Sequence, residues 1–129
     1  MTTELYALLA AVLIGLVYLS AAAFSFKAQA GNAYTVGARD AAIAPTGIAA
    51  RLHRAQANFM ETFPFFAACA LVVHITGTSG QLSLIGCALY LGGRILFLPL
   101  YALGTPWLRT FSWNAATLGL VLVGVQPLV

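Results

Sequence analysis

The chain has 129 residues, of which 61% are hydrophobic and only 7% are charged. Soluble domains carry about 25% charged residues, so this composition excludes an ordinary soluble enzyme and indicates an integral membrane protein. The net charge of +3 comes from six basic and three acidic residues. We expect membrane lipids, and no nucleic acid, among its partners.

Four long apolar runs follow one another along the chain, at residues 5–26, 55–76, 82–103 and 110–129. About 20 residues cross a bilayer as a helix. We therefore predict an all-α membrane protein, a four-transmembrane-helix bundle in one domain of residues 1–129, with helices at about 4–27, 47–76, 80–102 and 107–128. The first run has no basic n-region and no cleavage site, so we expect it to remain as the first helix.

The basic residues predict the orientation of the bundle. With four spans, the loops after the first and third helices lie on the same side, and positive charge favours the cytoplasmic side. We therefore expect a cytoplasmic basic face and both termini on the opposite side. The basic residues on or near that face are Lys27, Arg39, Arg51, Arg54, Arg94 and Arg109.

Four polar side chains share one face of the second predicted helix. At about 100° per residue, Arg51, Arg54, Asn58 and Glu61 fall within about 80° of one another. A carboxylate inside a membrane span costs at least a few kcal/mol unless it is paired or hydrated. Pro64 removes a backbone hydrogen bond and favours a kink just after Glu61.

The third predicted helix contains one charged residue, Arg94. It lies about 10 Å from the cytoplasmic end near Tyr101, a depth similar to that of Glu61. Because an unpaired charge at that depth is disfavoured, we predict that Arg94 pairs with Glu61. Tyr101 lies on the same face as Arg94, two turns later, and Gly92 and Gly93 would allow a neighbouring helix to come close.

Other polar and sulfur-containing residues receive structural interpretations. Cys69 and Cys87 lack metal-ligand or CxxC spacing, so we expect buried structural thiols and no metal site. Trp107 and Trp113 suit the aromatic belt at the headgroups, and His74 is interpreted as an interfacial residue.

The polar residues of the two central helices and of the mouth of the fourth helix predict one cytoplasmic-side cavity. Arginine forks match carboxylates, two amides offer further contacts, and a glutamate could hold an amine. A peptide-like ligand with two carboxylates and one ammonium group fits this set, and anionic lipid is the alternative. The residues are Arg51, Arg54, Gln56, Asn58, Glu61, Arg94, Tyr101 and Arg109.

The segment Arg54-Ala-Gln-Ala-Asn58-Phe-Met-Glu61-Thr-Phe-Pro64 resembles the signature of the MAPEG family, the membrane-associated proteins of eicosanoid and glutathione metabolism. The similarity covers nearly the whole chain. Family members are short four-helix proteins that form homotrimers and bind glutathione between subunits on the cytosolic side. The resemblance therefore implies a homotrimer with glutathione as co-substrate and a small hydrophobic electrophile as the second substrate.

Individual positions match the functional residues of the family. Arg54, Asn58 and Glu61 match glutathione contacts, Arg94 matches a buried arginine of the third helix, and Tyr101 matches a ligand-contacting tyrosine.

Two further matches imply catalytic roles. Arg109 matches the arginine that activates the glutathione thiol in the leukotriene synthase of the family. Thr110 falls where the prostaglandin E synthase of the family has a serine proposed to assist the thiol. A nearby guanidinium favours the thiolate and so lowers the pKa of a thiol.

Some positions depart from the animal members. Phe97 stands where these often have a tyrosine or histidine, and Thr62 replaces the tyrosine of the leukotriene synthase. The arginine pair that ends its first helix is absent, which leaves Lys27 and Arg39 as substitutes. The longer first loop resembles bacterial members and implies a bacterial plasma membrane.

Three functions are compared on these observations. The favoured hypothesis is a glutathione transferase or peroxidase that acts on hydrophobic electrophiles or lipid hydroperoxides. The alternative is a non-catalytic binder of anionic lipid or of another thiol. A small multidrug-type transporter ranks third, because the first helix has no internal acid of the kind that such transporters use.

Overall fold

The computed structural model describes all 129 residues and contains only helices, turns and loops. Four of the helices are long and apolar enough to cross a membrane. The predicted all-α, four-helix fold is confirmed. The elements are α1 (Thr3–Ala30), α2 (Asn32–Val36), α3 (Gly47–Thr76), α4 (Gln81–Ala102), α5 (Pro106–Val125) and the final turn η1 (Gln126–Leu128).

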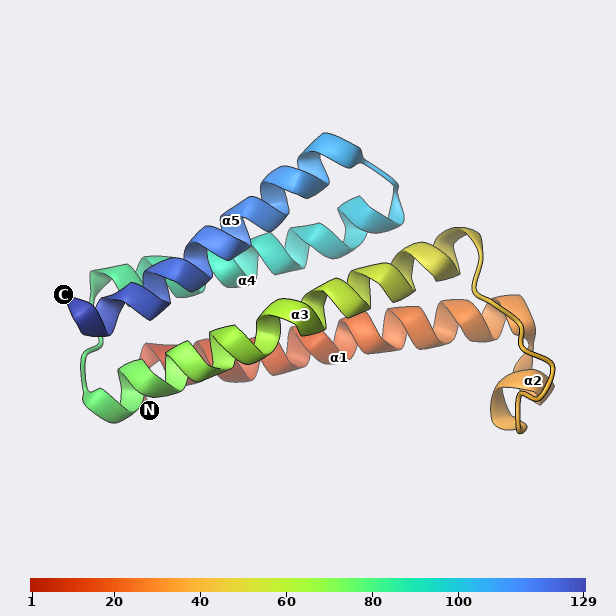
Figure 1. Ribbon diagram of the computed structural model, residues 1–129, viewed down its shortest axis with the longest axis horizontal. Helices are drawn as coiled ribbons and strands as arrows, with labels where there is room; N and C mark the ends of the chain where they lie inside the picture. The colour runs from red at the N-terminus through yellow and green to blue at the C-terminus, as the bar shows by residue number, and fades with distance from the viewer.

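The long helices form two antiparallel pairs. α1 lies along α3, and α4 lies along α5, with α4 also in contact with α1 and α3 (Figure 1). Both chain termini lie at one end of the bundle, and the short α2 with its loop lies at the other (Figure 1). The predicted basic face is therefore one end of the molecule, because the α1–α3 and α4–α5 connections both reach it.

The segment between α1 and α3 is held by hydrogen bonds to polar side chains. Gln29 reaches across it, donating to the Ala44 carbonyl at 3.0 Å and accepting from the Thr46 amide at 2.8 Å. The Tyr34 hydroxyl accepts from the Ile43 amide at 2.9 Å. Arg39 has a left-handed backbone (φ 58°), and its guanidinium donates back to the Thr35 carbonyl.

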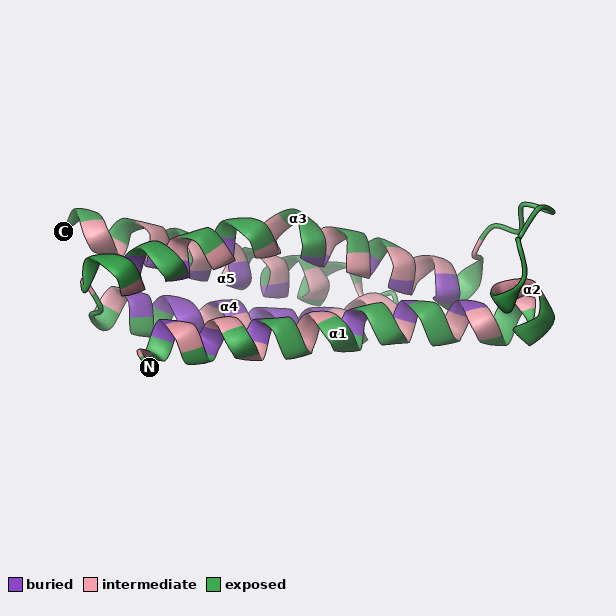
Figure 2. Cartoon of the chain, turned by 90° about the horizontal axis from the view of Figure 1, so that it is seen from below, coloured by how far each residue is buried: buried purple, intermediate pink, exposed green.

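Buried residues follow the lines where the helices meet, and the outer surfaces are exposed (Figure 2). The exposed surface is rich in large apolar side chains; α1 alone exposes Leu9, Leu13, Leu16 and Phe24. In water such a surface would be strongly unfavourable, but lipid is its natural solvent. The arrangement is that of a bundle whose helices contact each other on narrow faces.

α4 and α5 approach so closely that only glycine fits at the contact. A Cβ atom added at Gly119 would lie 2.5 Å from the Gly86 carbonyl oxygen and 2.6 Å from the Tyr90 amide nitrogen. One added at Gly93 would lie 2.7 Å from the Ser112 carbonyl oxygen, whereas Gly92 faces open space. The expected close approach is therefore found at Gly93 and not at Gly92.

A buried carboxylate joins the helix ends at the terminal side of the bundle. Glu4 is 1% exposed and accepts hydrogen bonds from Ser83 at 2.5 Å and from Ser79 at 2.9 Å. The Ser83 amide in turn donates to the Gln126 side chain at 3.1 Å. These contacts tie α1 to the start of α4 and to the end of the chain, and they satisfy the polar groups at the start of α4.

Gly119→Ala is expected to destabilise the bundle, because its methyl group would push the backbones of α4 and α5 apart. Overpacking of this kind costs about 1–3 kcal/mol, so the thermal unfolding temperature in detergent should fall. Gly92→Ala is the matched control, because it adds the same atoms to α4 where nothing lies within 4 Å. Equal unfolding temperatures for the two variants would contradict the close contact.

Candidate functional site

Arg94 lies at the centre of the bundle and is completely buried. Its guanidinium donates to the Asn58 side-chain oxygen at 2.7 Å and to the Thr62 hydroxyl at 2.6 Å. The rings of Phe59, Tyr90 and Phe97 surround it, with their centroids 5.2–5.9 Å from the guanidinium carbon. The buried cation is thus stabilised by hydrogen bonds to neutral oxygens and by cation–π contacts.

The predicted pairing of Arg94 with Glu61 is wrong. Glu61 is exposed on α3, and both hydrogen bonds of the Arg94 guanidinium go to Asn58 and Thr62. Asn58 and Thr62 are one turn apart and differ by about 40° around the helix, whereas Glu61 lies about 60° to the other side of Asn58. α4 packs against the Asn58–Thr62 side, so the carboxylate points away from the arginine.

Thr62 is a functional neighbour that sequence reasoning missed. Its hydroxyl accepts from Arg94 and lies 3.2 Å from the Tyr90 hydroxyl, so it links two polar groups of α4. The four-residue spacing from Asn58 was the available signal, because side chains at that spacing stack on one helix face.

Tyr18 of α1 contacts Arg94 and Phe59 at the same level of the bundle. Its buried hydroxyl donates to the Arg94 carbonyl at 2.6 Å, and its ring packs on Phe59 with centroids 4.8 Å apart. Three helices therefore meet at Arg94, although the sequence indicated no role for this tyrosine.

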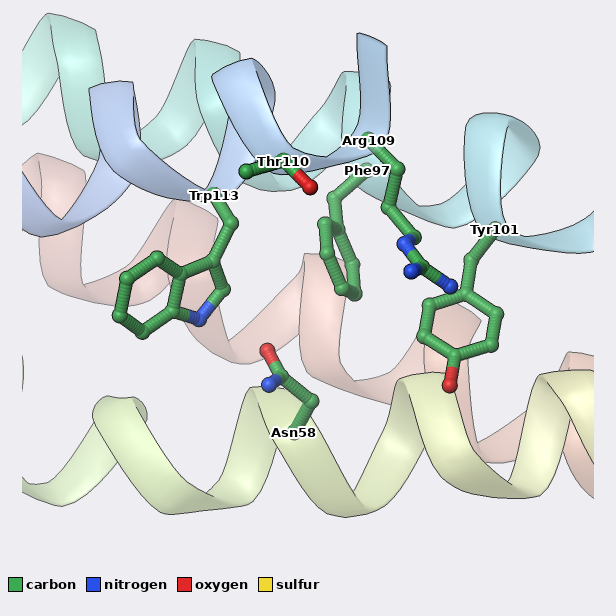
Figure 3. A pocket seen from close by; sticks show the side chains of 6 residues that line it. All are labelled: Asn58, Phe97, Tyr101, Arg109, Thr110 and Trp113. Carbon is green, nitrogen blue, oxygen red and sulfur yellow. The ribbon is translucent and has the colours of Figure 1, made fainter. Parts of the chain in front are cut away.

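A cavity of about 280 Å³ opens beside this network, between α3, α4 and α5. Figure 3 shows the side chains converging from the three helices, with the Arg109 guanidinium over the Tyr101 ring and the indole nitrogen of Trp113 directed toward Asn58. No acidic side chain lines it. The lining residues are Asn58, Phe97, Tyr101, Arg109, Thr110 and Trp113.

Two arginines meet at Tyr101 on the side of the cavity nearest the α4–α5 connection. The guanidinium carbon of Arg109 lies 4.6 Å from the ring centroid. Arg54 donates to the Tyr101 hydroxyl at 3.2 Å. Neither arginine has a carboxylate partner among its hydrogen bonds, so this end of the cavity has an uncompensated positive charge and favours an anion.

Thr110 is exposed beside Arg109. Its hydroxyl donates to the Pro106 carbonyl at 3.0 Å within α5. In this arrangement the hydroxyl hydrogen is already used, so Thr110 presents an acceptor oxygen to the cavity.

Some of the residues that were predicted to share one cavity do not line the cavity between α3, α4 and α5. Gln56 lines a second cavity of about 320 Å³ on the opposite side of α3, together with Lys27, Arg39 and His53. Arg51 is half-buried and lines neither cavity; its Nε atom is buried without a hydrogen-bond partner. Within one chain, the residues predicted to share one cavity therefore lie on both sides of α3.

Trp113 lines the cavity, a role that sequence reasoning did not predict for it. Its indole Nε1 is buried without a hydrogen-bond partner. Its position one turn after Arg109 was the available signal, because residues four apart share a helix face.

Comparison with protein families gives a match to the MAPEG family over residues 3–129, nearly the whole chain. The chain belongs to the MAPEG family. Comparison with curated proteins and with solved structures gave no match. Membership confirms the resemblance inferred from the helix motif, and it places this protein among glutathione-related membrane proteins whose four apolar helices it shares.

In this MAPEG protein, Arg94→Lys should lower the thermal unfolding temperature in detergent. An ammonium is a point charge on a shorter side chain and cannot reproduce the two-pronged contact to Asn58 and Thr62. Loss of one buried hydrogen bond to a charged group costs roughly 1–3 kcal/mol. Arg39→Lys, in the exposed loop, is the control and should have a much smaller effect. Similar shifts for the two variants would show that the Arg94 contacts contribute little.

Proposed function

We propose that this protein binds glutathione in the cavity between α3, α4 and α5 and acts as a glutathione transferase or peroxidase. The second substrate is a hydrophobic electrophile or a lipid hydroperoxide that arrives from the bilayer. The observation that supports this most directly is the meeting of Arg54 and Arg109 at Tyr101 without an acidic partner, in a chain of the MAPEG family.

The chemistry of the cavity suits a thiol that must ionise. Arg109 would stabilise the thiolate by its charge, which lowers the pKa of a bound thiol below its free value of about 8.5. The Thr110 oxygen, as an acceptor, is suited to receive the S–H hydrogen bond before ionisation. Arg94, behind Asn58, adds a further positive charge to those of Arg54 and Arg109 without lining the cavity.

The charged ends of glutathione require more partners than one chain presents in this cavity. Two carboxylates and an ammonium group must be held, and the cavity of one chain is at the small end of the range for ligand sites. The cations of the second cavity, Lys27 and Arg39, and the amide of Gln56 lie on the opposite side of α3. We propose that this second face completes the cavity of a neighbouring subunit in a homotrimer.

Exposed Glu61 supports the same assembly. Its carboxylate lies on the outer surface of α3, where lipid contact would be costly. A neighbouring subunit, or the ammonium group of glutathione, would remove it from lipid. The basic end of the trimer, which has the loops and both cavities, is then cytoplasmic by the positive-inside rule.

Arg109→Ala should abolish the ultraviolet absorbance of the thiolate that appears when glutathione is added to the wild-type protein in detergent. The physical reason is the loss of the cation that stabilises the sulfur anion. Asn114→Ala, at an exposed position on the same helix, is the control and should keep the signal. A thiolate signal that persists in Arg109→Ala would exclude this mechanism. Absence of saturable glutathione binding at millimolar concentration in the wild type would favour the binder of anionic lipid or of another thiol.

Mixed oligomers test whether the site is shared between subunits. A chain with Arg109→Ala and a chain with Lys27→Ala and Gln56→Ala should each lose activity alone. Co-expressed in equal amounts, they should recover about a quarter of the wild-type sites, because some interfaces then combine two intact faces. No recovery would mean that each site is formed by one chain.

A further inference from the structure

Three side chains from different parts of the chain pack on the ring of Phe26, near the end of α1. The His53 ring of α3 meets it edge-on, with ring centroids 5.7 Å apart, and the Tyr34 ring of α2 does so at 6.1 Å. The guanidinium carbon of Arg39 lies 5.7 Å from the centroid of the Phe26 ring. Tyr34 and Arg39 belong to residues 31–46, which join α1 to α3 at the end of the bundle opposite the chain termini (Figure 1). The contacts therefore hold this connecting segment against the two helices.

The connecting segment depends on a few side chains for its closed form. Arg39 has a left-handed backbone (φ 58°), which is unfavourable for a residue with a Cβ atom. Its guanidinium offsets this by donating to the Thr35 carbonyl at 2.9 and 3.2 Å. The amides of Ile43 and Thr46 donate to side chains and not to backbone carbonyls. A force that moves the Arg39 side chain would therefore also release a strained backbone.

His53 can add a positive charge beside Arg39. Its Nδ1 lies 2.7 Å from the Ala49 carbonyl oxygen of the same helix, and because a carbonyl can only accept, Nδ1 has the hydrogen. Nε2 is then the nitrogen that gains or loses a proton. Histidine is the side chain whose ordinary change of charge falls between about pH 5 and 8.

The cavity that His53 lines has cations and no carboxylate to offset a further charge. Lys27 of α1 and Arg39 of the connecting segment line the same cavity of about 320 Å³, and from α3 only the neutral Gln56 joins His53 there. Asp40, the acidic residue of the segment, is exposed and does not line the cavity. Like charges in a partly buried cavity repel each other more strongly than they do in water.

We propose that His53 is a pH-sensitive switch that opens the connecting segment between α1 and α3. With a neutral His53 the segment is closed over the Phe26 ring. With a cationic His53, repulsion by Lys27 and Arg39 disfavours the closed form and moves the Arg39 side chain away from the ring. The backbone of Arg39 then relaxes to an ordinary conformation, and the second cavity opens to water. The closed form is thus favoured at high pH and the open form at low pH.

Opening of the segment would also weaken the site proposed for glutathione. That site uses Lys27, Arg39 and Gln56 of the second cavity, and the switch changes where Arg39 lies relative to the other two. This consequence rests on the proposed function, whereas the movement of the segment does not.

Hydrogen exchange at the Ile43 and Thr46 amides, measured on the purified full-length protein without ligand, tests the switch. Their protection, relative to an unstructured chain at the same pH, should fall about tenfold between about pH 8 and about pH 5.5. His53→Phe keeps an aromatic ring against Phe26 and removes the titrating group, so protection should no longer change. His74→Phe, near the chain termini, is the matched control and should keep the pH dependence of the wild type.

Lys27→Gln tests the repulsion with His53 in place, because it removes one of the two cations that a charged imidazole meets. The fall in protection at low pH should become smaller. Protection that does not change with pH in the wild type, or an equal fall in His53→Phe, would overturn the switch. If His53→Phe lowers protection at every pH, the Lys27→Gln result decides, and an unchanged fall in that variant would overturn the proposal.

Glutathione affinity at the same two pH values separates the switch from the proposed function. In the wild type the affinity should fall at low pH, and in His53→Phe the fall should be smaller. An equal fall in both proteins would show that the segment does not control the site. Absence of glutathione binding at both pH values would contradict the proposed function, while the hydrogen-exchange result would still decide the switch.

Discussion

The hydrogen bonds of the buried Arg94 to Asn58 and Thr62 are the interaction on which the rest of the site depends. Placing a full charge at the centre of a bundle costs several kcal/mol, and here no carboxylate offsets it. The two hydrogen bonds and three surrounding aromatic rings provide the compensation. Because Tyr18 donates to the backbone carbonyl of the same residue, α1, α3 and α4 all contact Arg94 at one level of the bundle.

This constraint gives the neighbouring cavity its polarity. Arg94 donates to the side-chain oxygen of Asn58, and the amide of Asn58 lines the cavity. Arg109 and Trp113 also contribute donors, and no acidic residue lines the wall. Such a cavity favours ligands that bring acceptors and negative charge, which is the basis for proposing a bound thiolate. The residues that would hold the remaining charges lie on the other side of α3, which is why we propose a shared site between subunits.

Much of the fold and part of the site could be predicted from sequence. The length and composition of the apolar runs suffice to predict four membrane-spanning helices, because the thickness of the bilayer sets the length of such a helix. The helix motif led to the family, and Asn58, Tyr101, Arg109 and Thr110 do line one cavity. The predicted Arg94–Glu61 pair was wrong, although the two residues lie at similar depths along their helices. The side chain of Glu61 points to a different side of α3 from the side that faces Arg94. A face about 80° wide includes both side chains that meet α4 and side chains that point outward.

The sequence by itself determined that this protein is a four-helix membrane protein of the MAPEG family, because those features depend on local composition and on residue spacing within one helix. The tertiary structure decided which polar groups meet. The close glycine contacts between α4 and α5 fix how these two helices pack, and the way α3 lies against α4 selects Asn58 and Thr62 over Glu61 as partners of Arg94. It also placed Trp113 in the wall of the cavity, which the sequence did not predict. Such contacts depend on the rotation and approach of whole helices, which no spacing within a single helix specifies.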